Sequence, residues 1–97
     1  MVYRSTFQIY ADILTVADQS DRFGVQTTKL CLESNLPYSR FRGFVRNLTS
    51  SGLINKIEYD GKNTFVITAN GKKYLEEYKK FSDYAESFGL ELWIFVL

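Results

Sequence analysis

The sequence predicts an α+β domain, mainly α, built from three helices, a two-stranded hairpin and a long C-terminal helix. Three observations indicate this order. Helical patterns occupy three stretches before residue 52, Asp60-Gly61 lies between two β-favourable runs, and a helical apolar series follows residue 70. A chain of 97 residues has the length of one domain.

The first two helices are expected at residues 3–19 and 26–34. The second is expected to be capped by Thr27 or Thr28. Pro37 lies in the connection to the next helix, because proline disfavours a helical conformation in the residue before it. In the first helix, apolar side chains follow the spacing of one buried face. These are Phe7, Ile9, Tyr10, Ile13, Leu14 and Ala17.

The third helix is expected to begin at about Pro37 and to stop at Gly52, a residue type favoured just after a helix. Its apolar residues form one stripe, which predicts a buried face. They are Phe41, Phe44, Val45 and Leu48. The opposite face holds three arginines and no acid: Ser39, Arg40, Arg42, Gly43, Arg46 and Asn47.

Residues 53–59 and 64–68 are short β-favourable runs around Asp60-Gly61. This pair predicts a tight hairpin, because both central residues of a type I′ turn need positive φ. The final helix is expected to begin near Thr68 or Asn70.

A heptad seam is expected along the final helix, because its apolar residues alternate four and three apart over three repeats. They are Tyr74, Tyr78, Phe81, Ala85, Phe88, Leu92 and Phe95. Gly89 weakens a helix, so a bend or an end is open there. Residues 90–97 are almost wholly apolar and are expected to pack on a partner or on the body.

The composition argues against catalysis. The chain has no His and one Cys, Cys31, which is expected to be a buried small hydrophobe. No phosphate-binding glycine loop and no nucleophile elbow is present. We therefore expect no enzyme, no cofactor and no metal. We also expect no signal peptide and no membrane span, hence a cytoplasmic protein.

Charge is distributed unevenly along the chain. The net charge is only +1, but residues 22–80 carry eleven Lys and Arg against five Asp and Glu, a balance of +6. No acid occurs between residues 38 and 57. Such a basic central region favours a polyanionic partner over a merely solvated surface.

Three helices followed by a hairpin are the winged helix-turn-helix arrangement. The second and third of these helices form the helix-turn-helix pair, and the later helix of the pair enters the major groove of DNA. The sequence therefore predicts binding to double-stranded DNA, with the third helix reading the major groove and Lys62 at the wing tip on the backbone or minor groove. The candidate contacts are Thr27, Thr28, Lys29, Pro37, Tyr38, Ser39, Arg40, Arg42, Gly43, Arg46, Asn47 and Lys62.

Several roles stay open at this point. Each arginine suits either guanine or a phosphate. Gly43 suits close approach of the helix to a duplex, a tight crossing with another helix, or a tolerated defect with no role of its own. Thr27 and Thr28 suit a phosphate or a plain helix cap. Lys62 suits a phosphate contact or an exposed turn.

The stretch from Thr27 to Ile54, with Thr68-Ala69-Asn70-Gly71 after it, resembles the small archaeal winged-helix proteins, including those of archaeal viruses. The matching segments are Ser34-Asn35, Leu36-Pro37-Tyr38, Ser51-Gly52-Leu53 and the Thr-x-x-Gly opening of the last helix. The resemblance covers about residues 7 to 82. It implies a DNA-binding fold and dimerisation through an antiparallel coiled coil. Pro37, Gly43 and the tail 90–97 depart from the family pattern.

The seam predicts a homodimer independently of the resemblance, because its apolar stripe is longer than the surface that one small domain can cover. We expect residues 1–69 to form the DNA-binding part and residues 70–97 the dimerisation helix and tail, within one structural domain. The function expected is a transcriptional regulator, nucleoid-associated, or in the host cytoplasm if viral. A protein–protein interaction module and a non-specific architectural DNA binder are the alternatives. Neutralisation of the arginines by the chain's own acids would favour the interaction module.

Overall fold

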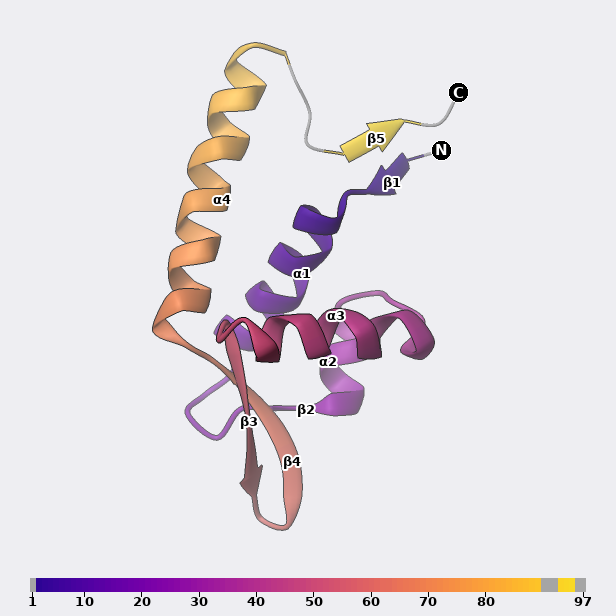
Figure 1. Ribbon diagram of the computed structural model, residues 1–97, viewed down its shortest axis with the longest axis vertical. Helices are drawn as coiled ribbons and strands as arrows, with labels where there is room; N and C mark the ends of the chain where they lie inside the picture. Colours follow the sequence, from indigo (N-terminus) through magenta and orange to yellow (C-terminus); the bar gives the residue numbers. More distant parts are fainter. Residues whose placement is uncertain (1, 90–92, 96–97) are drawn as a thin grey trace.

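Four helices and two small antiparallel sheets make up the computed structural model, which describes residues 2–89 and 93–95 (Figure 1). The helices are α1 (Thr6–Asp18), α2 (Thr27–Glu33), α3 (Tyr38–Ser50) and α4 (Ala69–Ser87). The strands are β1 (Val2–Arg4), β2 (Val25–Gln26), β3 (Ile54–Tyr59), β4 (Lys62–Ile67) and β5 (Trp93–Phe95). The predicted mainly α fold with a wing and a long last helix is confirmed.

The wing is the hairpin of β3 and β4, and it projects below the helices in Figure 1. Tyr59 pairs with Lys62 across the turn, where Asp60 and Gly61 both have positive φ, 54° and 75°. These angles are those of a type I′ turn, as the sequence predicted. A third strand, β2, pairs with β4 on its other side, which the sequence did not predict because two residues carry no periodicity.

The core lies between α1, α2, α3 and the base of the sheet. Its largest fully buried side chains are Phe41, Ile13, Leu14, Leu30, Leu48 and Ile54. Cys31 is also buried, as expected. Phe7 was predicted to share this core, but it is 66% exposed, because it stands in the first turn of α1, beyond the region that α2 and α3 cover.

The turn between α2 and α3 is held by Arg4. Its guanidinium donates to the carbonyl oxygens of Ser34 and Asn35, each at 2.8 Å, and pairs with Asp12 of α1 at 2.8 Å. Asn35 has a positive φ of 56°, which lets the chain reverse. Neither threonine caps α2: the capping position is Gln26, which makes no side-chain hydrogen bond to the helix.

The opening of α4 follows the Thr-x-x-Gly pattern. The Thr68 hydroxyl accepts a hydrogen bond from the amide of Gly71 at 3.0 Å and donates one to the carbonyl of Gly52 at 2.7 Å. A Cβ on Gly71 would collide with the carbonyl oxygen of Leu53. The threonine therefore caps α4, and the glycine lets α4 lie directly on the end of β3.

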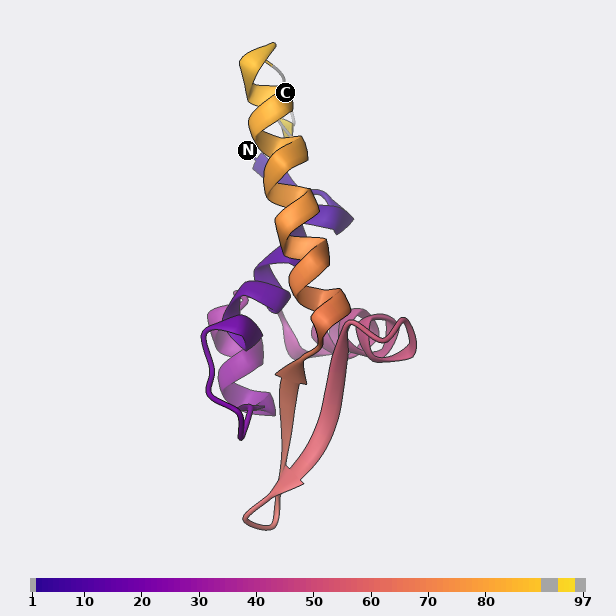
Figure 2. The same cartoon turned by 90° about the vertical axis from the view of Figure 1, so that its left-hand side faces the viewer.

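Helix α4 rises away from the wing and is exposed along much of its length (Figure 2). Of the two alternatives at Gly89, a bend or an end, the structure has the end: α4 stops at Ser87, and Gly89 follows with a φ of +75°, outside the helical region. Phe95 lies in β5, which pairs antiparallel with β1, and Leu92 lies outside the described residues. The heptad seam on α4 thus runs only from Tyr74 to the C-cap, Phe88.

Candidate nucleic-acid interface

A groove between α3 and the wing contains two of the three arginines. Arg42 and Arg46, four residues apart, lie on the flank of α3 that faces the hairpin. Lys56 of β3 and Asn63 of β4 line the opposite wall. The groove has a volume of about 440 Å³, and its floor includes Phe41, Val45 and Phe65 of the core.

The third arginine lies on the other flank. The Arg40 guanidinium lies 5.6 Å from the ring centre of Phe44, and Asn47 donates a hydrogen bond to the Tyr10 hydroxyl at 3.0 Å. Both positions therefore face the side of α1, away from the wing. The sequence predicted one basic face, whereas the structure divides these residues between two flanks of the same helix.

Small residues occupy the line between the flanks. Ser39 and Gly43 are both exposed, and a Cβ built on Gly43 meets nothing within 4 Å. The glycine thus serves no helix crossing among the described residues. Along this outermost line of α3, the helix backbone is exposed to solvent between the arginines of the two flanks.

None of the ion pairs formed by the described residues involves Arg40, Arg42 or Arg46. Instead, Arg42 lies 5.9 Å from the ring centre of Tyr38 and Arg40 lies near Phe44, geometries in which aromatic rings hold guanidinium groups in place. By contrast, the lysines at the middle of α4 have acidic neighbours: Lys79 pairs with Asp83, and Lys80 with glutamates on the same helix.

The wing presents different residues on its two faces. Directly opposed residues of a hairpin share a face, so Lys62 lies with Tyr59 on the face opposite to that of Lys56 and Phe65. Lys62 is exposed beside the turn, as expected, but it does not line the groove. Lys56 and Asn63 were not predicted: the register set by the Asp60-Gly61 turn places them on one face of the hairpin but does not reveal which face lies toward α3.

The start of α2 borders the same groove. Thr27 lines it, whereas Thr28 is exposed alongside. Lys29 is exposed and lies 3.7 Å from Glu33, a surface pair of little energetic weight. Pro37 occupies the capping position of α3, directly before Tyr38.

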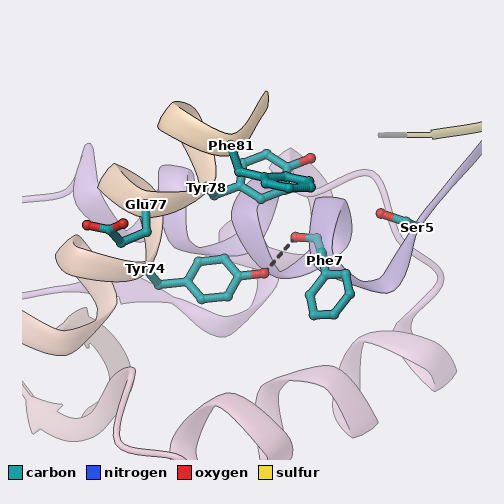
Figure 3. A pocket seen from close by; sticks show the side chains of 6 residues that line it. All are labelled: Ser5, Phe7, Tyr74, Glu77, Tyr78 and Phe81. Carbon is teal, nitrogen blue, oxygen red and sulfur yellow. Dashed lines mark hydrogen bonds between the residues drawn. The ribbon is translucent and has the colours of Figure 1, made fainter. Parts of the chain in front are cut away.

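A second surface lies at the upper end of the molecule, between α1 and α4. A largely apolar hollow of about 450 Å³ is lined by Ser5, Phe7, Tyr74, Glu77, Tyr78 and Phe81 (Figure 3). The Tyr74 hydroxyl donates to the carbonyl oxygen of Phe7 at 2.9 Å, and the Tyr78 hydroxyl donates to Gln8 at 2.5 Å. Burial, with smaller contributions from Tyr78 and Tyr10, raises the pKa of Tyr74 to about 12, so this hydroxyl remains a donor at neutral pH.

The seam predicted for dimerisation is therefore used in two ways. Its first two members, Tyr74 and Tyr78, pack on α1 of the same chain, and Ala85 is buried. Phe81 and Phe88 are 59% and 64% exposed. Two aromatic residues outside the predicted set join them on this surface: Phe7 and Tyr84, 66% and 65% exposed.

In the part of the chain that the structure describes, no cluster of His, Cys, Asp or Glu is arranged to hold a metal ion. Over the same residues, no helix combines the length and the apolar character that crossing a membrane requires.

A family profile described as winged helix-turn-helix matches residues 3–86. Among solved structures, the chain is similar to the crystal structure of Sso10a-2, a DNA-binding protein from Sulfolobus solfataricus. The TM-score is 0.72 at 20% sequence identity, and the match covers 88% of this chain and 85% of that chain. At that identity the likeness concerns the fold. No curated protein matches the sequence.

Proposed function

Because the chain belongs to the winged helix-turn-helix family, we propose that it binds double-stranded DNA as a homodimer and acts as a transcriptional regulator. The resemblance to archaeal winged-helix proteins that the sequence motifs indicated is confirmed. The similar Sulfolobus protein is described as DNA-binding, which agrees with the proposal. A location in the cytoplasm, on the nucleoid or in the cytoplasm of a virus host, is part of the proposal.

The observation that carries the proposal is the groove between α3 and the wing. Arg42, Arg46 and Lys56 line it, and no acidic side chain among the described residues pairs with either arginine. A row of unpaired cations beside an exposed helix suits a phosphate strand that runs along the border of the major groove.

In the proposed complex α3 lies in the major groove. Arg42 and Arg46 contact the phosphate strand between α3 and the wing, and Arg40 reaches toward the other border. Ser39 and Gly43 face the base edges, and Asn47, whose amide donates to Tyr10, lies with Arg40 at the border toward α1. Lys62, at the wing tip, lies on the adjacent backbone or minor groove, and the amides at the start of α2 beside Thr27, Thr28 and Lys29 approach a phosphate.

We infer that the dimer forms at the upper end of α4. Phe7 and Phe81 leave large aromatic surfaces exposed at the hollow, and the paired rings of Tyr84 and Phe88 are exposed farther along α4, which is typical of an interface. In this interface Tyr74 and Tyr78 form the floor of the hollow and do not contact the second copy of the chain. Strand β5, paired with β1, lies at the same end of the molecule (Figure 1).

The first experiment is a titration of a random-sequence duplex at several salt concentrations. The test variant is Arg42→Ala with Arg46→Ala, and the matched control is Lys79→Ala with Lys80→Ala, which removes the same charge from lysines that already have acidic partners. Each lost phosphate contact lowers the slope of log K against log salt by about 0.9, so we expect a reduction of roughly two per protomer for the test variant only. Equal effects of both pairs, or no binding of the wild type at low salt, would contradict the proposal.

Regulation requires a preference for particular sequences, so the second experiment selects bound sequences from a random pool. A regulator should lose about 1–3 kcal/mol per mismatch in the selected site. An enriched pool without a consensus, together with a steep salt slope, would instead support the architectural alternative.

The dimer is tested by sedimentation of Phe81→Ser with Phe88→Ser. We expect this variant to become a monomer that keeps its fold, since both side chains are mostly exposed. A wild type that sediments as a monomer at every concentration would exclude the dimer.

A further inference from the structure

An apolar hollow lies on the other side of Tyr38 from the cationic groove. It has a volume of about 290 Å³ and is lined by Thr27, Thr28, Cys31, Leu32, Leu36 and Tyr38. Leu32 is 73% exposed and Tyr38 is 56% exposed, so two large apolar surfaces meet solvent here. The lining residues that carry a polar side chain are Thr27, Thr28, Tyr38 and Cys31, whose thiol donates to the carbonyl oxygen of Leu36 at 3.2 Å.

The hollow continues the proposed DNA surface. Thr27 and Tyr38 line both the hollow and the groove of Arg42 and Arg46. The Arg42 guanidinium, 5.9 Å from the ring centre of Tyr38, lies on the groove side of that ring. Whatever occupies the hollow therefore lies beside the strand that the arginines bind.

Tyr38 is the first residue of α3, and the first residues of a recognition helix are those that contact base edges. Base edges in the major groove carry donors and acceptors, with one apolar exception, the C5-methyl group of thymine. The side chains of Leu32 and Leu36 form an uncharged apolar wall that suits that methyl group, whereas the threonine hydroxyls beside it suit a phosphate oxygen.

We propose that the hollow beside Tyr38 receives thymine methyl groups, so that Leu32 and Tyr38 give the protein a preference for thymine at the end of its site where α3 begins. This inference rests on the proposed DNA binding and adds the base type that is read. The arginines of the groove supply affinity for any duplex, and the hollow supplies the discrimination.

The test compares a short alternating A·T duplex with the same duplex containing deoxyuridine in place of thymidine. Deoxyuridine lacks only the methyl group, so base pairing and charge are retained. Burial of one methyl group corresponds to about a fourfold change in affinity, so we expect the wild type to bind the thymidine duplex about fourfold more tightly for each methyl group buried.

Two variants assign that difference to the hollow. Leu32→Ser is expected to bind both duplexes equally, whereas Leu32→Met keeps an apolar side chain and should keep the preference. Both should fold, because Leu32 is mostly exposed. Arg46→Ala serves as the control for affinity alone: it is expected to weaken binding to the two duplexes by the same factor.

The outcomes separate the inference from the proposed function. If neither duplex binds at low salt, DNA binding itself is wrong and the inference is wrong with it. If both bind equally to the wild type, or if Leu32→Ser keeps the preference, DNA binding stands and the thymine contact is wrong. If Leu32→Ser changes the sedimentation of the free protein, the hollow contacts a second copy of the chain, which overturns the inference.

Discussion

Replacing Gly43 by Ala should have opposite effects on the free protein and on its complex with DNA. Gly43 lies inside α3, where Ala is favoured over Gly by about 1 kcal/mol. The added Cβ meets nothing within 4 Å, so no clash reduces that gain. For a domain of this size, about 1 kcal/mol corresponds to a rise of roughly 4–8 °C in Tm.

In the proposed complex the same methyl group points at the bases, because Gly43 lies on the outermost line of α3, between the flank of Arg42 and the flank of Arg40. Forcing a methyl group into a closely packed contact costs about 1–3 kcal/mol. Affinity should therefore fall by roughly 5- to 150-fold, while the slope of binding against salt stays the same because no cation is lost.

The assays are thermal unfolding of the free protein and anisotropy titration of a labelled duplex. Thr15→Ala is the matched control, since it also replaces an exposed helical residue by Ala, on α1. This control should leave DNA binding unchanged. A Gly43→Ala protein that is more stable and binds DNA as tightly as the wild type would refute the close approach of α3. If Gly43→Ala does not raise the Tm, the open environment of Gly43 is refuted.

Three further predictions concern the frame that holds these surfaces. Arg4→Ala should lower the free energy of unfolding in urea by about 1–3 kcal/mol, because it leaves the carbonyls of Ser34 and Asn35 without their donor, and Arg4→Lys should restore only part of it. An unchanged urea midpoint would show that the hydrogen bonds of Arg4 do not stabilise the fold. Gly71→Ala should destabilise by about 1–3 kcal/mol or more, because its Cβ meets a backbone carbonyl, and a stabilised variant would contradict the close approach of α4 to β3. The pKa of Tyr74 is raised from 10.0 to about 12, so its contribution to stability is complete below about pH 10 and is lost as the pH rises toward 12. The Tm of the wild type should therefore fall more steeply over that window than the Tm of Tyr74→Phe, and parallel curves would contradict the raised pKa.

Local signals made most of the fold predictable from the sequence. The Asp60-Gly61 pair specifies a turn by its own backbone preferences, and Thr68 with Gly71 specifies how α4 begins. The apolar stripe of α3 likewise shows directly which face is buried, since Phe41, Val45 and Leu48 are all in the core. Each of these signals can be recognised within a short segment of the chain.

The features that were missed depend on distant partners. Strand β2 exists because β4 offers it an edge, which two residues of sequence do not reveal. Phe7 has the spacing of a core residue, yet it lies beyond the reach of α2 and α3 and is exposed. The apolar residues continue at heptad spacing beyond Phe88, but the backbone leaves the helical conformation at Gly89. The spacing of apolar residues alone does not reveal where a helix ends.

The division of the arginines follows from the geometry of α3 and bears on how selective the protein is. Residues 42 and 46 are four apart and share a flank, whereas residue 40 falls on the flank of residue 47. In the proposed complex, cations on two borders match the two phosphate strands that bound a major groove, so they would position the helix without reading it. Selectivity would then depend on the few uncharged groups between and beside the borders, namely Ser39 and the hollow at Tyr38.

The proposed dimer would supply the selectivity that one protomer lacks. In the proposed complex a single α3 offers few base contacts, so a selective site would need a second copy at a fixed distance. The exposed aromatic residues at the end of α4 lie far from the wing and leave α3 unobstructed (Figures 1 and 2). A net charge of only +1 gives little repulsion between copies, which favours association through these residues. If Phe81→Ser with Phe88→Ser produces monomers, sequence preference should therefore fall more than the affinity for random DNA.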